Sequence, residues 1–139
     1  MNKVRDNKGK RLHAPFCKVI NSLFFALKGL ARLIRYERNA RIHLLATVVV
    51  TICGLLFKIE PVEWALIAVV VGMVFLSELF NTAIENIADI VSPEWNAKIE
   101  IIKDYSAAAV LVSALVALVV GAVVFMPRIL KFIEMGFNL

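Results

Sequence analysis

The sequence lacks the short motifs around which soluble nucleotide-binding enzymes are built. It contains no Gly-x-x-x-x-Gly-Lys-Ser/Thr loop, no Gly-x-Gly-x-x-Gly turn and no soluble-kinase signature, so those families are excluded. The two cysteines, Cys17 and Cys53, lie in an amphipathic segment and an apolar run. Their spacing matches neither a disulfide framework nor a metal cluster. The sequence also has no internal repeat and no low-complexity tract, so a single structural unit is expected.

Charged residues are sparse over most of the chain and concentrated near its beginning. The 139 residues are 60% hydrophobic with a mean hydropathy of +0.80, which predicts a small integral membrane protein. The formal net charge is +5, and eleven of the sixteen Lys and Arg residues lie at or before Arg41. Residues 1–13 are expected to form a basic cytosolic tail near anionic lipid headgroups. Lys18 and Lys28 interrupt the apolar core that a signal peptide needs, so this tail is expected to be retained.

Hydrophobic periodicity predicts an all-α integral membrane fold. Over residues 15–35 the apolar positions recur at i, i+3, i+4 and i+7, which predicts an amphipathic helix lying on the membrane surface. A helix docked on a soluble partner is the alternative for this segment. Three apolar runs long enough to cross a core of about 30 Å follow. These spans are expected at about 42–59, 62–90 and 104–126. Together they predict a membrane domain at 14–130, followed by a C-terminal tail at 131–139.

The distribution of basic residues predicts the orientation of the spans. Lys and Arg crowd the N-terminal side of the first span, whereas the link after it contains only Lys58. Because basic residues favour the cytosolic side, the N-terminus is expected in the cytosol and the C-terminus outside. Arg128 and Lys131, beyond the third span, are exceptions to this rule.

Four polar residues share one face of the expected second span. At 100° per residue, they form a stripe about 80° wide that extends some 16 Å along the helix. Ionisable groups inside a membrane span are costly and indicate a functional site. Three spans bury such a stripe poorly, so an oligomer is expected. The stripe consists of Glu78, Asn81, Glu85 and Asp89.

These residues suit phosphoryl transfer, although the pattern alone leaves other interpretations open. Carboxylates at this spacing can hold Mg²⁺ with substrate phosphates, and Lys103 can supply positive charge to those phosphates. Glu37 is a candidate second metal carboxylate, reaching the site from before the first span. The stripe could instead only hold an oligomer together, or form an ion or proton pathway. His43 has no partner at ligand spacing and is expected to be an interfacial hydrogen-bonding group.

Three segments resemble the signature blocks of the prokaryotic diacylglycerol kinase family, and their detailed forms are closer to its undecaprenol kinase branch. The resemblance extends from about Phe16 to Arg128. The three segments are Glu37-Arg38-Asn39-Ala40-Arg41-Ile42-His43, Glu78-Leu79-Phe80-Asn81-Thr82-Ala83-Ile84-Glu85 and Lys103-Asp104-Tyr105-Ser106-Ala107-Ala108-Ala109-Val110.

The resemblance implies a homotrimer with active sites at the cytosolic membrane interface. It implies that Glu78 is the catalytic base, and that Glu37 and Glu85 hold Mg²⁺ with the ATP phosphates. Asp89 is a supporting polar group. The implied ATP contacts are Lys18, Glu37, Glu85, Glu94, Trp95, Asn96, Lys103 and Asp104. The implied lipid contacts are Lys18, Asn39, Arg41, Glu78, Asn81 and Ala107.

Three positions depart from the diacylglycerol kinase pattern. Lys18 replaces an arginine, Phe25 replaces a tyrosine, and Ala107 replaces a serine near the lipid. These departures concern the lipid acceptor more than the metal site.

The resemblance therefore predicts an ATP-dependent undecaprenol kinase in the bacterial cytoplasmic membrane, with no nucleic-acid partner. Diacylglycerol is the alternative acceptor. A non-enzymatic oligomeric ion or proton pathway is the alternative of another class.

Overall fold

The computed structural model describes residues 15–137, with side chains described from Val19 to Met135. The expected basic tail at 1–13 lies outside the described residues. The described part of the chain is helical apart from short links. Its helices are α1 (Pro15–Tyr36), α2 (Arg38–Phe57), α3 (Pro61–Val91) and α4 (Ala97–Phe137).

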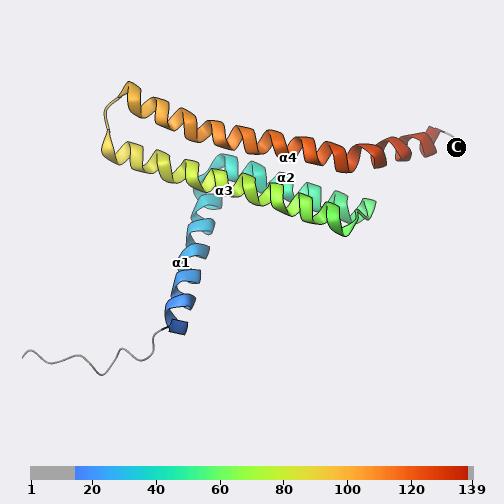
Figure 1. The fold of residues 1–139 in the computed structure, drawn as a ribbon, viewed down its shortest axis with the longest axis horizontal. Helices are drawn as coiled ribbons and strands as arrows, with labels where there is room; N and C mark the ends of the chain where they lie inside the picture. The colour runs from blue at the N-terminus through green and yellow to red at the C-terminus, as the bar shows by residue number, and fades with distance from the viewer. Residues whose placement is uncertain (1–14, 138–139) are drawn as a thin grey trace, which may run out of the picture.

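The helices α2, α3 and α4 run side by side, whereas α1 projects from one side of them (Figure 1). The most extensive helix–helix contact is between α3 and α4, and α1 contacts α2 and α3. Three helices are long and apolar enough to cross a membrane. By length and composition, these helices of the described residues match the three expected spans, and they extend over Arg38–Phe57, Pro61–Val91 and Ala97–Met135.

The helix α4 is longer than the span expected from hydropathy. It begins at Ala97 rather than near residue 104, because the Asn96 Oδ1 atom accepts a hydrogen bond from the Lys98 backbone N–H at 3.0 Å and caps the helix. It then continues through Pro127 to Phe137, so residues 131–137 of the expected C-terminal tail are helical. Its 41 residues correspond to about 62 Å, twice the thickness of a hydrocarbon core.

A tight link joins α2 to α3. Lys58 adopts the left-handed conformation with φ of 50°, and the Ile59 N–H donates to the Gly54 carbonyl oxygen at 3.1 Å. The next helix starts with Pro61, and the side chains of Glu60 and Glu63 form a reciprocal capping box at its first turn. The link therefore returns the chain antiparallel to α2.

Close packing at this end of the bundle depends on Gly54. A Cβ atom at this position would lie 2.7 Å from the Trp64 ring, so only glycine lets α2 approach the indole. Beside this contact, the buried side chains of Ile59, Ile67 and Val124 form a small hydrophobic core. The packing fixes α2, α3 and α4 against one another at one end and leaves the polar residues at the other.

Candidate active site

Two neighbouring cavities share the side chains of Glu85 and Ala107. The first, here called the inner cavity, has a volume of about 340 Å³ and lies among α2, α3 and α4. The second, the loop cavity, has a volume of about 420 Å³ and lies between the end of α3 and the start of α4. The inner cavity is lined by Asn39, Ile42, His43, Glu78, Asn81, Glu85, Ala107, Val110, Leu111 and Ala114. The loop cavity is lined by Glu85, Asp89, Ser92, Pro93, Glu94, Trp95, Asn96, Ile99, Glu100, Lys103, Asp104 and Ala107.

Glu78 is the carboxylate of the inner cavity, and its side chain is deeply buried. Its exposed fraction is 1%, and its Oε2 atom accepts no hydrogen bond from any described residue. A buried polar oxygen without a partner is energetically costly and calls for an explanation such as a ligand. A hydroxyl group entering the inner cavity would supply the missing hydrogen bond.

Glu78 interacts electrostatically with two further carboxylates, Glu37 and Glu85. Glu37 precedes α2; its backbone N–H donates to the Leu33 carbonyl oxygen at 2.8 Å, and its side chain makes no capping hydrogen bond. It lines a third cavity, of about 550 Å³, next to α1 rather than the inner or loop cavity. Glu37 and Glu85 are thus close enough to act on the Glu78 carboxylate electrostatically, but Glu37 borders a different cavity.

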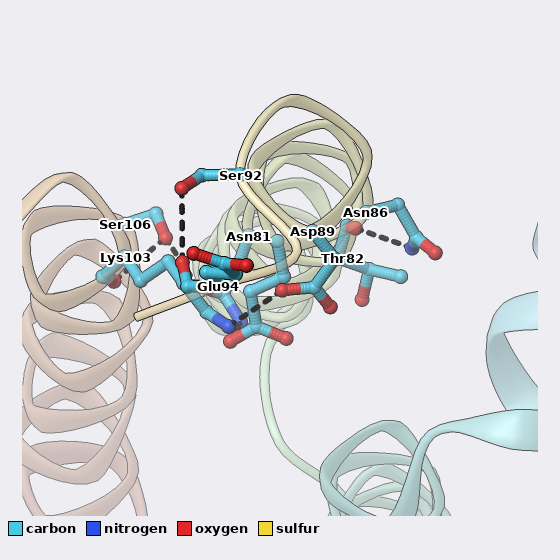
Figure 2. A network of polar contacts seen from close by, with 9 residues as sticks. Asn81, Thr82, Asn86, Asp89, Ser92, Glu94, Lys103 and Ser106 are labelled. Carbon is cyan, nitrogen blue, oxygen red and sulfur yellow. Dashed lines mark hydrogen bonds and ion pairs between the residues drawn. The ribbon is translucent and has the colours of Figure 1, made fainter. Parts of the chain in front are cut away.

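A chain of hydrogen bonds connects α4 to Glu85 through Asn81. The Ser106 hydroxyl lies 2.7 Å from the Asn81 Oδ1 atom, and the Asn81 Nδ2 atom donates to the Glu85 Oε1 atom at 3.0 Å. Figure 2 shows Ser106 reaching from α4 toward Asn81 on α3. The helical period places Asn81 and Glu85 on one face, as predicted, because residues four apart are neighbours on a helix.

Lys103 and Asp89 form an ion pair across the loop cavity, with a distance of 3.0 Å between Nζ and Oδ1 (Figure 2). The Lys103 side chain is 37% exposed and that of Asp89 is 70% exposed. Ion pairs between such exposed groups contribute little to stability. The free-energy cost of separating Lys103 from Asp89 is therefore small, so Lys103 can bind a more highly charged ligand in place of Asp89.

The link between α3 and α4 is ordered by its own side chains. The Ser92 hydroxyl donates to the Glu94 carbonyl oxygen at 2.9 Å, and the Trp95 indole N–H donates to the Glu100 carboxylate at 2.6 Å. Asn96 caps α4, as described above. These contacts hold Glu94, Trp95 and Asn96 at the edge of the loop cavity.

The structure brings most, but not all, of the predicted site residues to the two cavities. Asn39 and Ala107 line the inner cavity, and Asp104 lines the loop cavity. Arg41 is exposed and lines neither of them. The side chain of Lys18 lies outside the described residues.

Two residues of the site were not predicted to be functional. Ser106 is buried and bonded to Asn81, and its position in a run of small residues gave no indication of that contact. His43 lines the inner cavity and also an adjoining apolar cavity, so it does belong to the site. Its position on the same helical face as Asn39, four residues earlier, is the signal that could have indicated this.

Comparisons with known proteins identify the family. Residues 24–125 match the model described as prokaryotic diacylglycerol kinase. The chain is 33% identical over 112 residues to an undecaprenol kinase from Bacillus subtilis, covering 81% of this chain and 91% of that relative. It is 32% identical over 111 residues to a diacylglycerol kinase from Synechocystis, covering 79% of this chain and 63% of that relative. The resemblance of the three sequence blocks is thereby confirmed, and the chain belongs to the prokaryotic diacylglycerol kinase family.

Proposed function

We propose that this protein is a membrane lipid kinase that transfers the γ-phosphate of ATP to the hydroxyl group of undecaprenol. The observation that carries the proposal is the buried Glu78 carboxylate, which lies in a cavity whose walls combine polar side chains with apolar ones such as Val110 and Leu111. That cavity shares Glu85 with a polar cavity containing Lys103. A lipid hydroxyl can thus reach the site from the membrane while the nucleotide reaches it from the water.

Glu78 is proposed to act as the general base. The lipid hydroxyl donates a hydrogen bond to its unpaired Oε2 atom, and the proton moves to the carboxylate as the hydroxyl oxygen attacks the γ-phosphorus. The bond between the γ-phosphorus and the bridging oxygen breaks, and ADP leaves. The apolar walls of the inner cavity, including Val110 and Leu111, limit the access of water that would otherwise compete as acceptor.

Mg²⁺ is proposed as the cofactor, held by Glu85 and Glu37 together with the ATP phosphates. Within the described residues, no three His, Cys, Asp or Glu side chains converge into a metal-binding cluster. This donor set fits Mg²⁺, which is commonly bound by one or two carboxylates, substrate phosphates and water. When bound, the ion would neutralise phosphate charge during transfer.

The loop cavity is proposed to hold the nucleotide. Lys103 would release Asp89 and contact the phosphates, with Asp104 beside it. Glu94, Trp95 and Asn96 border the same cavity and are proposed to contact the rest of the nucleotide. The proposed lipid contacts in the inner cavity are Asn39, Asn81 and Ala107, with Arg41 and Lys18 as further candidates near the interface.

The lipid acceptor and the assembly also belong to this proposal. Undecaprenol is favoured because this chain aligns with 91% of the length of the undecaprenol kinase relative. It aligns with only 63% of the length of the diacylglycerol kinase relative. Diacylglycerol is the second candidate, favoured by that other relative. We further propose a homotrimer in the bacterial cytoplasmic membrane, with α1 on the cytosolic surface, the N-terminus in the cytosol and the C-terminus outside.

The test is phosphate transfer from ATP labelled at the γ-position, with undecaprenol or diacylglycerol in vesicles as acceptor. The expected product is labelled polyprenyl phosphate from the wild type and none from Glu78→Gln. Label only in phosphatidate would assign the second candidate. No label in either lipid would contradict the kinase assignment and favour a non-enzymatic membrane role.

A further inference from the structure

The Ser106 side chain is buried between α3 and α4 and forms a hydrogen bond from one helix to the other. Its exposed fraction is 7%, and its hydroxyl oxygen lies 2.7 Å from Asn81 Oδ1 and 2.8 Å from the Lys103 carbonyl oxygen. Asn81 is equally buried, at 7%. A hydrogen bond between buried partners persists only in one geometry, because neither group can turn to water instead.

Chemistry fixes the direction of each bond in this chain. The Glu85 carboxylate can only accept when ionised, so the Asn81 amide must turn its Nδ2 atom toward it. The Asn81 Oδ1 atom then faces Ser106 and can only accept. The Ser106 hydroxyl must therefore provide the proton, which it shares with the Lys103 carbonyl oxygen.

We infer that Ser106 is a positioning residue for phosphate transfer: its hydroxyl orients the Asn81 amide, which in turn holds the Glu85 carboxylate where the inner and loop cavities meet. The inference rests on the proposed function, in which Glu85 holds the magnesium ion. Ser106 itself lines neither cavity and acts only through Asn81. Without the hydroxyl, the amide can rotate and Glu85 loses the bond to its Oε1 atom.

The chain contains a matched control in Ser113, two helical turns further along α4. Ser113 is also buried, with an exposed fraction of 4%, but its hydroxyl donates to the Val110 carbonyl oxygen of its own helix at 2.8 Å. Substitution of Ser113 by alanine removes a buried hydroxyl from the same helix without touching Asn81. It therefore reports the cost of losing a buried serine alone.

The experiment compares Ser106→Ala, Ser106→Thr and Ser113→Ala in the full-length protein. For Ser106→Ala we expect the Mg²⁺ concentration at half-maximal activity to rise about five- to ten-fold, as for the loss of one hydrogen bond. The KM for the lipid should stay within about two-fold of wild type. Ser106→Thr keeps the hydroxyl and should restore the Mg²⁺ dependence, and Ser113→Ala should match wild type. Equal Mg²⁺ dependence in both alanine variants would overturn the inference.

A second measurement does not depend on turnover. A non-hydrolysable ATP analogue with Mg²⁺ should raise the Tm of wild type and Ser113→Ala equally, and that of Ser106→Ala by less than half as much. If Ser106→Ala does not fold, Ser106→Cys fills the space of the hydroxyl with a slightly larger, weakly donating thiol and should show the same reduced shift. A full shift in the Ser106 variants contradicts the inference even if lipid phosphorylation is confirmed. Absence of lipid phosphorylation in the wild type instead contradicts the proposed function.

Discussion

The Arg128 guanidinium and the Glu63 carboxylate are joined by two hydrogen bonds, of 2.9 and 2.7 Å, that tie the last part of α4 to the first turn of α3. Both side chains are about a quarter exposed, at 25% for Arg128 and 23% for Glu63. This paired geometry is the one that the planar guanidinium favours with carboxylates. Arg128 is one of the two basic residues that were exceptions to the expected charge distribution, and Glu63 neutralises its charge.

Loss of this pair should loosen the end of the bundle opposite the site. We expect Arg128→Met to lower the Tm in detergent by about 2–6 °C, because it leaves Glu63 without its cationic partner. Lys131→Met removes an exposed charge one turn further along α4 and should have little effect. Equal Tm values for the two variants would show that the pair does not stabilise the fold.

Substitution of Gly54 should lower the stability of the protein far more than substitution of Gly72, which has free space around it. In Gly54→Ala the new methyl group would lie 2.7 Å from the Trp64 ring, so either the indole or the two helices must shift, at a cost of about 1–3 kcal/mol. In Gly72→Ala nothing lies within 4 Å of the new methyl group, and the higher helix propensity of alanine should leave stability unchanged or raised. Denaturation followed by tryptophan fluorescence measures the stability of both variants. A Gly54→Ala protein as stable as Gly72→Ala would contradict the close packing.

Neutralising Glu78 should separate catalysis from folding. Glu78→Gln keeps the size of the side chain but cannot accept the hydroxyl proton, so kcat should fall about 10²- to 10⁴-fold. Because Glu78 interacts with Glu37 and Glu85, loss of its charge relieves repulsion, and the Tm should be equal to or higher than that of wild type. Steady-state kinetics and thermal unfolding test the two parts. A kcat within about three-fold of wild type would remove Glu78 from the role of base.

Removal of the Glu85 carboxylate should mainly raise the Mg²⁺ concentration that activity requires. In Glu85→Ala, we expect activity at ordinary Mg²⁺ concentrations to be lost and to return only in part at high Mg²⁺, since one carboxylate ligand is gone. The adjacent Asn86→Ala provides the control, because Asn86 is exposed and its side chain donates to the Thr82 carbonyl oxygen of its own helix. Titration of activity with Mg²⁺ measures both variants. Full activity of Glu85→Ala at ordinary Mg²⁺ would remove it from the metal site.

Relationships within one helix were predictable from the sequence, and relationships between helices were not. The period of the helix is enough to place Glu78, Asn81 and Glu85 on one face. The contact between Ser106 and Asn81 depends on how far α4 is shifted along α3, which is determined by packing along the whole interface. The pairing of Arg128 with Glu63 depends on the same shift.

The first residue of α4 shows a second reason why the sequence did not predict the whole structure: a membrane span and the helix that contains it need not start at the same residue. Hydropathy marks where a helix can contact lipid, so it predicted a start near residue 104. The helix itself starts where its first N–H groups find acceptors, and Asn96 provides one for the Lys98 N–H. The extra turns bring Ile99 and Glu100 to the wall of the loop cavity.

The two cavities meet at only two side chains, the carboxylate of Glu85 and the single methyl group of Ala107. The size of residue 107 therefore contributes to the width of the opening between the inner cavity, which contains Glu78, and the more polar loop cavity. A valine or leucine at position 107 would narrow this opening. In the proposed reaction it would keep the lipid hydroxyl apart from the nucleotide, although every charged group of the site stayed in place. The small side chain at position 107 thus leaves room between the two cavities that a larger residue would fill.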